Sequence, residues 1–526
     1  MLHNVFTDRG FGKAAHATFQ VVAKALVIIV GLAAAGTAAR AAAPVLTTTV
    51  IEGSTIYSAA DLFATYRDQL GRPITRENAQ AIVAALAEQY QRDGFARPEL
   101  RLDDSWTARG MLRIEVSEPR ITRVTITGAV GRHADELERI GAGLRESQPL
   151  RRDAVQEAMR QMRELPGLTL TASTRRDEST PNGHELVVQA DFAPLEGLVR
   201  MNNRGTEEVG RNFMLAQVIA NGLLGWEEKL GLFATAATDA DEYAGAGLFL
   251  DTPINERGTR ANTMVFRSES APNESPVNLS DEYLRERAVV RVTHPVRRGA
   301  GLNFALSVAL EAEDLSVDRD GLEIRDDRLR IFEVGGRISW RLGEATQCSS
   351  MIELRQGLDA LGAGLQAADL ANDPRRSDFL LAQAQFGTLT RLNDSWALRV
   401  DTFLQQTAYV LPDSERFKIG GDRLGRGFEV AEIAGDQGAG GKVELRRELT
   451  RSGAFFGRTS AYGFYDIGAT WKQDQPGRES AATAGVGVAM QGARLNGYLE
   501  VAKPLTHPDV EGNRDTMLFA ELSLRF

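Results

Sequence analysis

Cysteine is almost absent from this chain of 526 residues, and histidine is rare. The single cysteine, Cys348, cannot form an internal disulfide, and no thiolate cluster is available to hold zinc or an iron–sulfur centre. The six histidines are scattered with no pair at ligand spacing, so we expect no metal site and no cofactor. They are His3, His16, His133, His184, His294 and His507.

Long basic blocks are also missing. The formal net charge is -10, which argues against a nucleic-acid partner. Aromatic residues make up only 7% of the chain while glycine occurs 51 times, a balance that favours an extended, turn-rich architecture over a dense globular core.

Long apolar runs are missing except near the N-terminus. Arg9, Lys13 and Lys24 there accompany an apolar run at 25–35, followed by small residues and a possible cleavage site before Ala42. The run is shorter than the roughly 20 residues that span a bilayer, so we predict a secretory signal over residues 1–41. The alternative is an uncleaved anchor. Without later apolar runs, the mature chain is either soluble and exported or held in a membrane by something other than helices.

Residues 42–193 show helical periodicity in two similar units, 42–119 and 120–193. In each, the pattern predicts the order strand, helix, helix, strand, strand. Ser58 with Asp61 resembles a capping box, and Thr75 precedes a second helix that ends at Asp93-Gly94. The two units resemble tandem POTRA domains, although two unrelated small α+β domains are an alternative. Short sheets have open edges that can bind an extended chain, which indicates binding modules without catalytic residues.

Residues 194–526 alternate apolar and polar positions in segments of about ten residues. We predict an all-β transmembrane barrel of about 16 antiparallel strands, with a half-buried sandwich as the alternative. An even number returns the chain to the side where it began. The predicted strands are 198–203, 212–221, 229–238, 243–252, 261–270, 287–295, 302–314, 330–342, 347–358, 379–392, 396–409, 440–449, 459–471, 483–492, 494–505 and 516–526.

One stretch, RLGRGFEVAEIAGDQGAGGKVELRREL, falls largely in the sixth outer loop, 410–439. It holds Arg426, Gly427 and Phe428. The thirteenth predicted strand contains Phe464, Asp466 and Gly468 on one face. A lipid-facing aspartate would be costly, so Asp466 should point into the lumen, where Arg426 could reach it if the loop folds inward. A phosphate-binding loop is excluded, because Asp436 and Val443 occupy the positions of its glycine and its serine or threonine.

These two motifs resemble those of the barrel-assembly and two-partner-secretion superfamily, in which a V-R-G-[FY] loop lies in the lumen beside an F-x-D-x-G strand. Here Gly425 replaces the first valine. The terminal Phe526 resembles the assembly signal of outer-membrane barrels. With two POTRA-like modules and about 330 barrel residues, nearly the whole mature chain resembles the two-partner secretion transporters of the ShlB/FhaC/HecB haemolysin secretion/activation family. The plug helix that is usual in that family is not expected, because few residues separate Ala42 from the first module.

The resemblance implies a porin-like channel for protein transport, which is not an enzyme and needs no nucleotide. A haemolysin- or adhesin-like partner would bind the POTRA modules in the periplasm as an extended chain and cross the outer membrane of a diderm bacterium through the barrel. Other implied partners are outer-membrane lipid and the barrel-assembly machinery. The alternatives are an assembly or insertion factor for other membrane proteins and a passive porin. The sequence leaves open the exported partner, the gating mechanism, the oligomeric state and the host organism.

Overall fold

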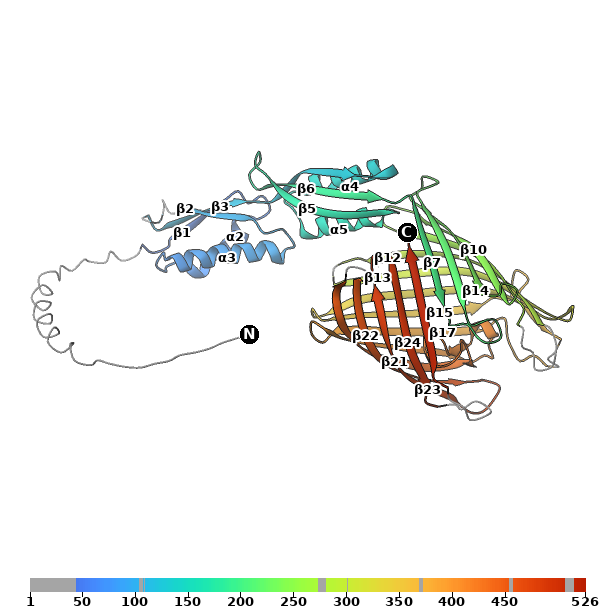
Figure 1. The fold of residues 1–526 in the computed structure, drawn as a ribbon. Coiled ribbons are helices and arrows are strands. Elements are labelled where there is room, and N and C mark those ends of the chain that lie inside the picture. Colours follow the sequence, from blue (N-terminus) through green and yellow to red (C-terminus); the bar gives the residue numbers. More distant parts are fainter. Residues whose placement is uncertain are drawn as a thin grey trace, which may run out of the picture. The chain divides into compact units, whose positions relative to one another are not determined.

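The computed structural model describes residues 44–526 except 104–106, 108, 273–280, 300, 369–371, 454–456 and 507–514 (Figure 1). The predicted signal segment, 1–41, therefore lies outside the described residues. By their internal contacts, the described residues form two compact units. The first contains the chain up to Arg120 with Gln148–Arg151 and Asp177–Gly183, and the second contains Ile121–Ser147, Arg152–Arg176 and His184–Phe526.

The first unit is a three-stranded sheet covered by two helices. Its elements are β1 (Thr48–Glu52), α2 (Ala59–Tyr66), η1 (Arg67–Gln69), α3 (Arg76–Arg92), β2 (Glu99–Asp103) and β3 (Met111–Ser117). The central strand β3 pairs parallel with β1 and antiparallel with β2. Ser58 and Asp61 form a reciprocal capping box at the start of α2, as the sequence predicts.

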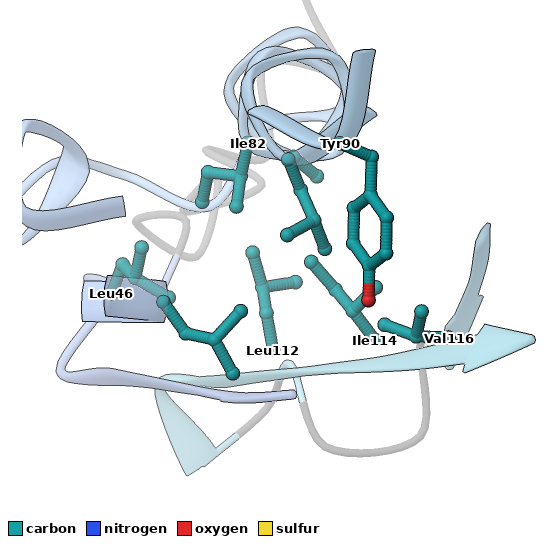
Figure 2. Close-up of a cluster of buried hydrophobic side chains, with 9 residues drawn as sticks. Leu46, Ile82, Tyr90, Leu112, Ile114 and Val116 are labelled. Atoms are coloured by element: carbon teal, nitrogen blue, oxygen red, sulfur yellow. The ribbon is translucent and has the colours of Figure 1, made fainter. Parts of the chain in front are cut away.

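The core of this sheet forms where the apolar face of α3 meets β3. Ile82 and Tyr90 from the helix are fully buried with Leu112 and Ile114 from the strand (Figure 2). The helical spacing of three and four therefore meets the strand spacing of two in one apolar layer. The Tyr90 hydroxyl donates a hydrogen bond of 2.6 Å to Glu118 Oε1. This bond satisfies the polar end of an otherwise buried ring.

The second small sheet has the same order of elements. They are β4 (Arg120–Gly128), η3 (Gly131–His133), α4 (Ala134–Glu146), α5 (Arg152–Glu164), β5 (Leu168–Asp177) and β6 (Gly183–Phe192). The strand order is β4-β6-β5, so the last strand in sequence again takes the central place. The predicted repeat of strand, helix, helix, strand, strand is confirmed. Within the described parts of the chain, no helix is both long and apolar enough to cross a bilayer.

The remainder forms a closed antiparallel barrel of sixteen spanning strands, as predicted. The final strand pairs with the first to close it. A short extra strand, β16 (Gly364–Ala367), pairs with the outer part of β14. The spanning strands are β7 (Leu195–Asn202), β8 (Phe213–Asn221), β9 (Lys229–Ala237), β10 (Tyr243–Pro253), β11 (Arg260–Ser270), β12 (Asp281–Arg297), β13 (Leu302–Arg319), β14 (Leu322–Leu342), β15 (Thr346–Gly357), β17 (Leu380–Arg391), β18 (Trp396–Thr407), β21 (Gln437–Gly453), β22 (Gly457–Trp471), β23 (Glu479–Gln491), β24 (Leu495–Pro504) and β25 (Met517–Arg525).

The bounds of four strands differ clearly from the prediction. Strands β12, β13 and β14 extend well beyond the predicted 287–295, 302–314 and 330–342. Their additional residues carry charges on both faces, so the apolar alternation that marks a strand disappears there. Strand β21 begins at Gln437, three residues before the predicted start at 440. The prediction missed these residues because they are mostly glycine and show no alternation of apolar and polar side chains.

The outer wall of the barrel shows where the apolar band ends. Val265 pairs with Ala288 on the outward face, and one step further along the strands Arg267 pairs with Glu286. Both members of this second pair are exposed and form an ion pair of 3.0 Å. A belt of apolar residues bounded by charged residues is the pattern of a strand that crosses a bilayer.

A luminal loop fixed to the barrel wall

The connection between β18 and β21, residues 408–436, folds into the barrel and is called the luminal loop below. It contains η4 (Asp413–Glu415) and a small hairpin of β19 (Phe417–Ile419) and β20 (Ile433–Gly435). The hairpin closes an apolar cluster with the barrel wall. Its buried residues are Phe417, Ile419, Leu424, Phe428 and Ile433 from the loop with Phe403 and Ala481 from β18 and β23.

Glycines of the barrel wall make room for this cluster. Gly440 and Gly468 face the lumen on β21 and β22 and are direct cross-strand partners. A Cβ at Gly468 would lie 2.9 Å from Ile419 Cδ1 and 3.0 Å from Leu424 Cδ2, and one at Gly440 would overlap Leu424. The glycines therefore leave a flat surface on the wall against which the loop packs, and we call Gly440 and Gly468 the glycine seat. This also gives the glycine of the Phe464–Gly468 motif a steric reason.

The loop backbone needs glycine at the first motif position. Gly425 has φ +81°, and a Cβ there would lie 2.7 Å from Ile419 Cγ2. A valine would be strained in this conformation. Gly425, which stands where the V-R-G-[FY] motif has valine, therefore fits the local backbone. At Gly427, a Cβ would lie 2.7 Å from Thr483 Cγ2, so the turn also approaches the wall closely.

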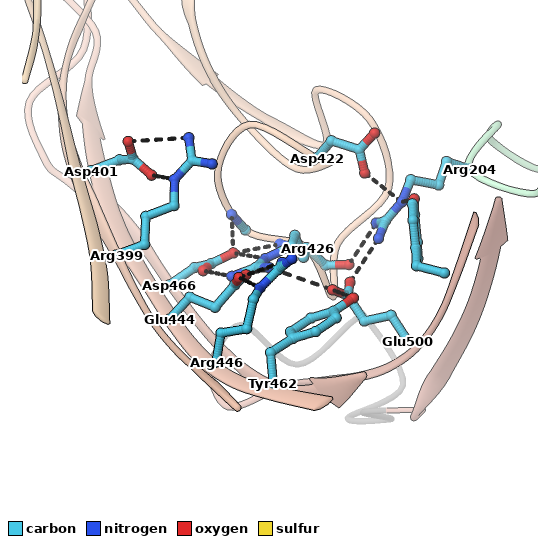
Figure 3. A network of polar contacts seen from close by, with 12 residues as sticks. Arg204, Arg399, Asp401, Asp422, Arg426, Glu444, Arg446, Tyr462, Asp466 and Glu500 are labelled. Carbon is cyan, nitrogen blue, oxygen red and sulfur yellow. Dashed lines mark hydrogen bonds and ion pairs between the residues drawn. The ribbon is translucent and has the colours of Figure 1, made fainter. Parts of the chain in front are cut away.

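The turn places Arg426 directly on Asp466. The guanidinium donates from Nη2 to Asp466 Oδ1 at 2.9 Å and from Nε to Oδ2 at 3.1 Å (Figure 3). The backbone N–H groups of Gly425 and Arg426 also donate to Oδ2. Asp466 is fully buried, whereas its strand neighbours Tyr465 and Ile467 are exposed on the outward face. The structure therefore brings together the two residues that the sequence singled out, with Asp466 pointing inward.

Three further side chains complete the surroundings of Arg426. Its Nη1 donates to Glu444 Oε2 at 3.0 Å and to Glu500 Oε2 at 3.4 Å. Its guanidinium carbon lies 3.5 Å from the ring centre of Phe464. The first motif residue on β22 is thus a cation–π platform for the loop arginine. Phe428 lies in the apolar cluster and does not join these polar contacts.

Sequence reasoning missed a second arginine in this network. Arg204, just after β7, donates from Nη2 to Glu500 Oε1 at 2.7 Å and from Nη1 to the carbonyl oxygen of Arg426 at 3.4 Å. It also pairs with Asp422 of the luminal loop and lies over the ring of Phe519 at 4.1 Å. No local sequence pattern indicates a role for Arg204, because its partners are over 200 residues away in sequence.

The sequence profile of the family described as haemolysin secretion/activation protein ShlB/FhaC/HecB matches residues 185–491, more than half of the chain. The chain belongs to this family. It is an outer-membrane transporter of the two-partner secretion type, and not an enzyme.

Individual relatives agree with this assignment. The chain is 22% identical over 468 residues to the outer membrane transporter CdiB of Dickeya dadantii, with 86% of this chain and 82% of the relative covered. Among solved structures it is similar to CdiB from Escherichia coli (TM-score 0.73, 17% identity, 94% and 92% of the two chains covered). CdiB from Acinetobacter baumannii gives a TM-score of 0.62 at 14% identity over 92% and 90% of the two chains.

The transporter has a second attachment of the loop that the sequence analysis also missed. Glu415 of η4 accepts from Arg355 of β15 at 2.8 and 2.9 Å. Arg355 also donates to Glu333 at 2.7 Å and to Glu311 at 3.2 Å, and all four side chains are buried. The loop is therefore tied to β13–β15 at its start and to β21–β24 at its turn.

The C-terminal residue, Phe526, lies where the last strand of the barrel pairs with the first. Phe526 exchanges backbone hydrogen bonds of 2.7 and 3.0 Å with Gly197 of β7. Its ring lies where a Cβ of Gly197 would be, and it remains mostly exposed on the barrel exterior. Phe526 therefore extends the pairing of the last strand with the first.

Proposed function

We propose that this transporter exports one large partner protein, haemolysin- or adhesin-like, across the outer membrane. The observation that carries the proposal is the luminal loop. It fills part of the lumen, yet ion pairs and side-chain packing hold it to the wall, contacts that can break without opening the barrel. A passive porin needs no such movable element.

The two small sheets would bind the partner before it enters the barrel. Each has three strands, so its outer strands, β1 and β2 in one sheet and β4 and β5 in the other, are available for strand addition. An extended polypeptide can pair with such an edge through its backbone, which gives affinity with little demand on sequence. Export of an unfolded chain requires this kind of recognition.

The arrangement in the cell follows from the same proposal. Residues 1–41 would direct export, the POTRA domains 42–119 and 120–193 would lie in the periplasm, and 194–526 would form the barrel with the loop region 410–439 inside. The motif residues Arg426, Gly427, Phe428, Phe464, Asp466 and Gly468 would hold the loop closed at rest. Phe526 would be read by the barrel-assembly machinery during insertion into outer-membrane lipid.

Export is tested by comparing cells with and without the gene by quantitative mass spectrometry of the medium and the outer membrane. We expect the loss of one large secreted protein while the outer-membrane proteome stays unchanged. A broad loss of barrels from the membrane would contradict export and would identify an assembly factor. Complementation with Arg426→Ala then tests the loop, and we expect correct insertion with altered secretion.

A further inference from the structure

The lumen has one sector whose chemistry differs from the rest. Residues directly opposite each other on antiparallel strands point to the same face, so the inward face can be followed around the barrel. Arg287 bonds to Glu311, which shares Arg355 with the luminal loop, and Arg287 is paired with Phe266. Phe266 therefore faces the lumen. The pairs Phe266–Gly247 and Gly247–Phe233 extend the same face to β10 and β9.

On β8–β11 most of this inward face is uncharged, and large apolar side chains lie there beside amides and hydroxyls such as Gln217, Thr235 and Ser268. Lys229, Asp251 and Arg260 lie at one end of their strands, and beyond them the inward positions of these four fully described strands carry no formal charge. Seven half-buried phenylalanine, leucine, isoleucine and methionine side chains line the sector, and we call them the luminal strip. They are Phe213, Leu215, Ile219, Phe233, Phe249, Met264 and Phe266.

The rings of the strip lie flat against the wall. Phe233 and Phe266 are stacked, with ring centres 5.8 Å apart and planes at 10°, on either side of Gly247. A Cβ at Gly247 would lie 2.5 Å from Phe233 Cζ, and one at Gly231 would overlap the ring of Phe249. Glycine on the inward face thus lets the rings cover the neighbouring strand. The rings of Phe233, Phe249 and Phe266 therefore form a flat aromatic surface over β9–β11.

A water-filled barrel is expected to have a polar inner wall, so this strip requires a reason. The ion pairs and the apolar cluster of the luminal loop lie on β13–β24 and on the segment after β7, and the strip lies on the other strands. An exported chain in its unfolded state exposes the apolar side chains that it will later bury. The backbone N–H and C=O groups of β8–β11 are already paired with neighbouring strands of the barrel. A passing chain could therefore contact the strip only through side chains.

We infer that the luminal strip is the surface along which the exported polypeptide passes, contacting the apolar and aromatic side chains of an extended chain weakly and with little sequence preference. This inference rests on the proposed export function and specifies its route. The flat rings suit such a role, because aromatic faces attract many apolar groups without fixing one geometry.

The first test uses the purified full-length protein in planar bilayers with a short synthetic peptide in which phenylalanine alternates with serine. A peptide with alanine in place of phenylalanine is the reference. We expect the phenylalanine peptide to block the current longer, and Phe233→Gln/Phe266→Gln to shorten its dwell time about tenfold. Leu389→Gln is the matched control, because Leu389 is an exposed apolar residue that faces the lumen on β17, outside the strip. Equal dwell times in the double variant and the wild type would overturn the inference.

The second test measures export and contact in cells. Cys348→Ser removes the single cysteine, and Phe249→Cys then gives a unique crosslinking site in the strip. We expect disulfide adducts with a cysteine-bearing exported protein from this site and few from Leu389→Cys. Equal amounts of adduct from both sites would contradict the inference. So would a result in which Phe249→Cys forms a disulfide with a cysteine introduced into the luminal loop but none with the exported protein. If the wild-type protein exports nothing, the proposed function fails instead. Folding of every variant is checked by heat-dependent gel migration.

Discussion

The guanidinium of Arg426 and the carboxylate of Asp466 meet through two side-chain hydrogen bonds, and both residues are buried. The two residues are 40 positions apart in sequence, one in the luminal loop and one on β22. A buried pair of this kind contributes little net stability when intact, but removing one partner is costly because the other charge stays buried. The pair is therefore suited to hold a loop in one position until a larger force displaces it.

Arg426→Gln should release the turn of the luminal loop. It leaves Asp466 buried without its cation, a loss that typically costs about 3–5 kcal/mol. We expect faster hydrogen exchange in residues 417–435 and a larger channel conductance. Arg426→Gln combined with Asp466→Asn removes both charges and should cost less than the sum of the two single changes. Purely additive effects would contradict direct coupling.

The glycine seat predicts that alanine at two adjacent positions affects the stability of the luminal loop differently. Gly440→Ala places a methyl group into Leu424 and should loosen the loop, lowering its stability by about 1–3 kcal/mol. Gly441→Ala is the control, because its Cβ would face outward with Asp401 O at 3.5 Å, an ordinary contact. Limited proteolysis of the loop in purified protein compares them. Equal cleavage rates in the two variants would exclude the seat.

The second loop attachment predicts an asymmetry between its partners. Arg355→Gln leaves Glu415 buried without a hydrogen-bonded cation, while Glu311 and Glu333 keep Arg287 and Arg291. Glu415→Gln instead leaves Arg355 with two carboxylates. We expect Arg355→Gln to destabilise the protein by several kcal/mol more than Glu415→Gln. Thermal unfolding in detergent followed by circular dichroism measures the difference. A larger effect of Glu415→Gln would mean that Arg355 is not the centre of the cluster.

His133 predicts a pH dependence in the second small sheet. Burial lowers the pKa of this histidine below its usual value near 6.5, with the carbonyl of Pro166 3.0 Å from Nε2. The unfolded chain therefore binds a proton that the folded state resists, and stability should fall as the pH drops below about 6.5. His133→Gln should flatten the pH dependence of the thermal unfolding temperature between pH 7 and 5. An unchanged slope would show that other groups cause it.

Much of this architecture is readable from the sequence because it depends on local periodicity. The helices at Ala59–Tyr66 and Arg76–Arg92 follow from a capping box, a threonine cap and apolar residues three and four apart. The sixteen strands follow from alternation imposed by lipid on one side and water on the other. The prediction was wrong in the outer parts of β12–β14, where charged residues on both faces interrupt the apolar alternation.

The candidate site divides along the same line. The sequence alone pointed to the motif residues Arg426 and Asp466, because a carboxylate flanked by apolar outward residues in the lipid-covered part of a strand is costly unless it faces inward, and a glycine-flanked arginine can turn toward it. Only the tertiary structure decided the partners Arg204, Glu444, Glu500, Arg355 and Glu415 and the aromatic strip on β8–β11. A strand sequence states which residues share a face, but closure of the barrel decides which strands become neighbours and where the loop lies. Burial and charge pairing among residues hundreds of positions apart depend on that closure, and no local pattern encodes it.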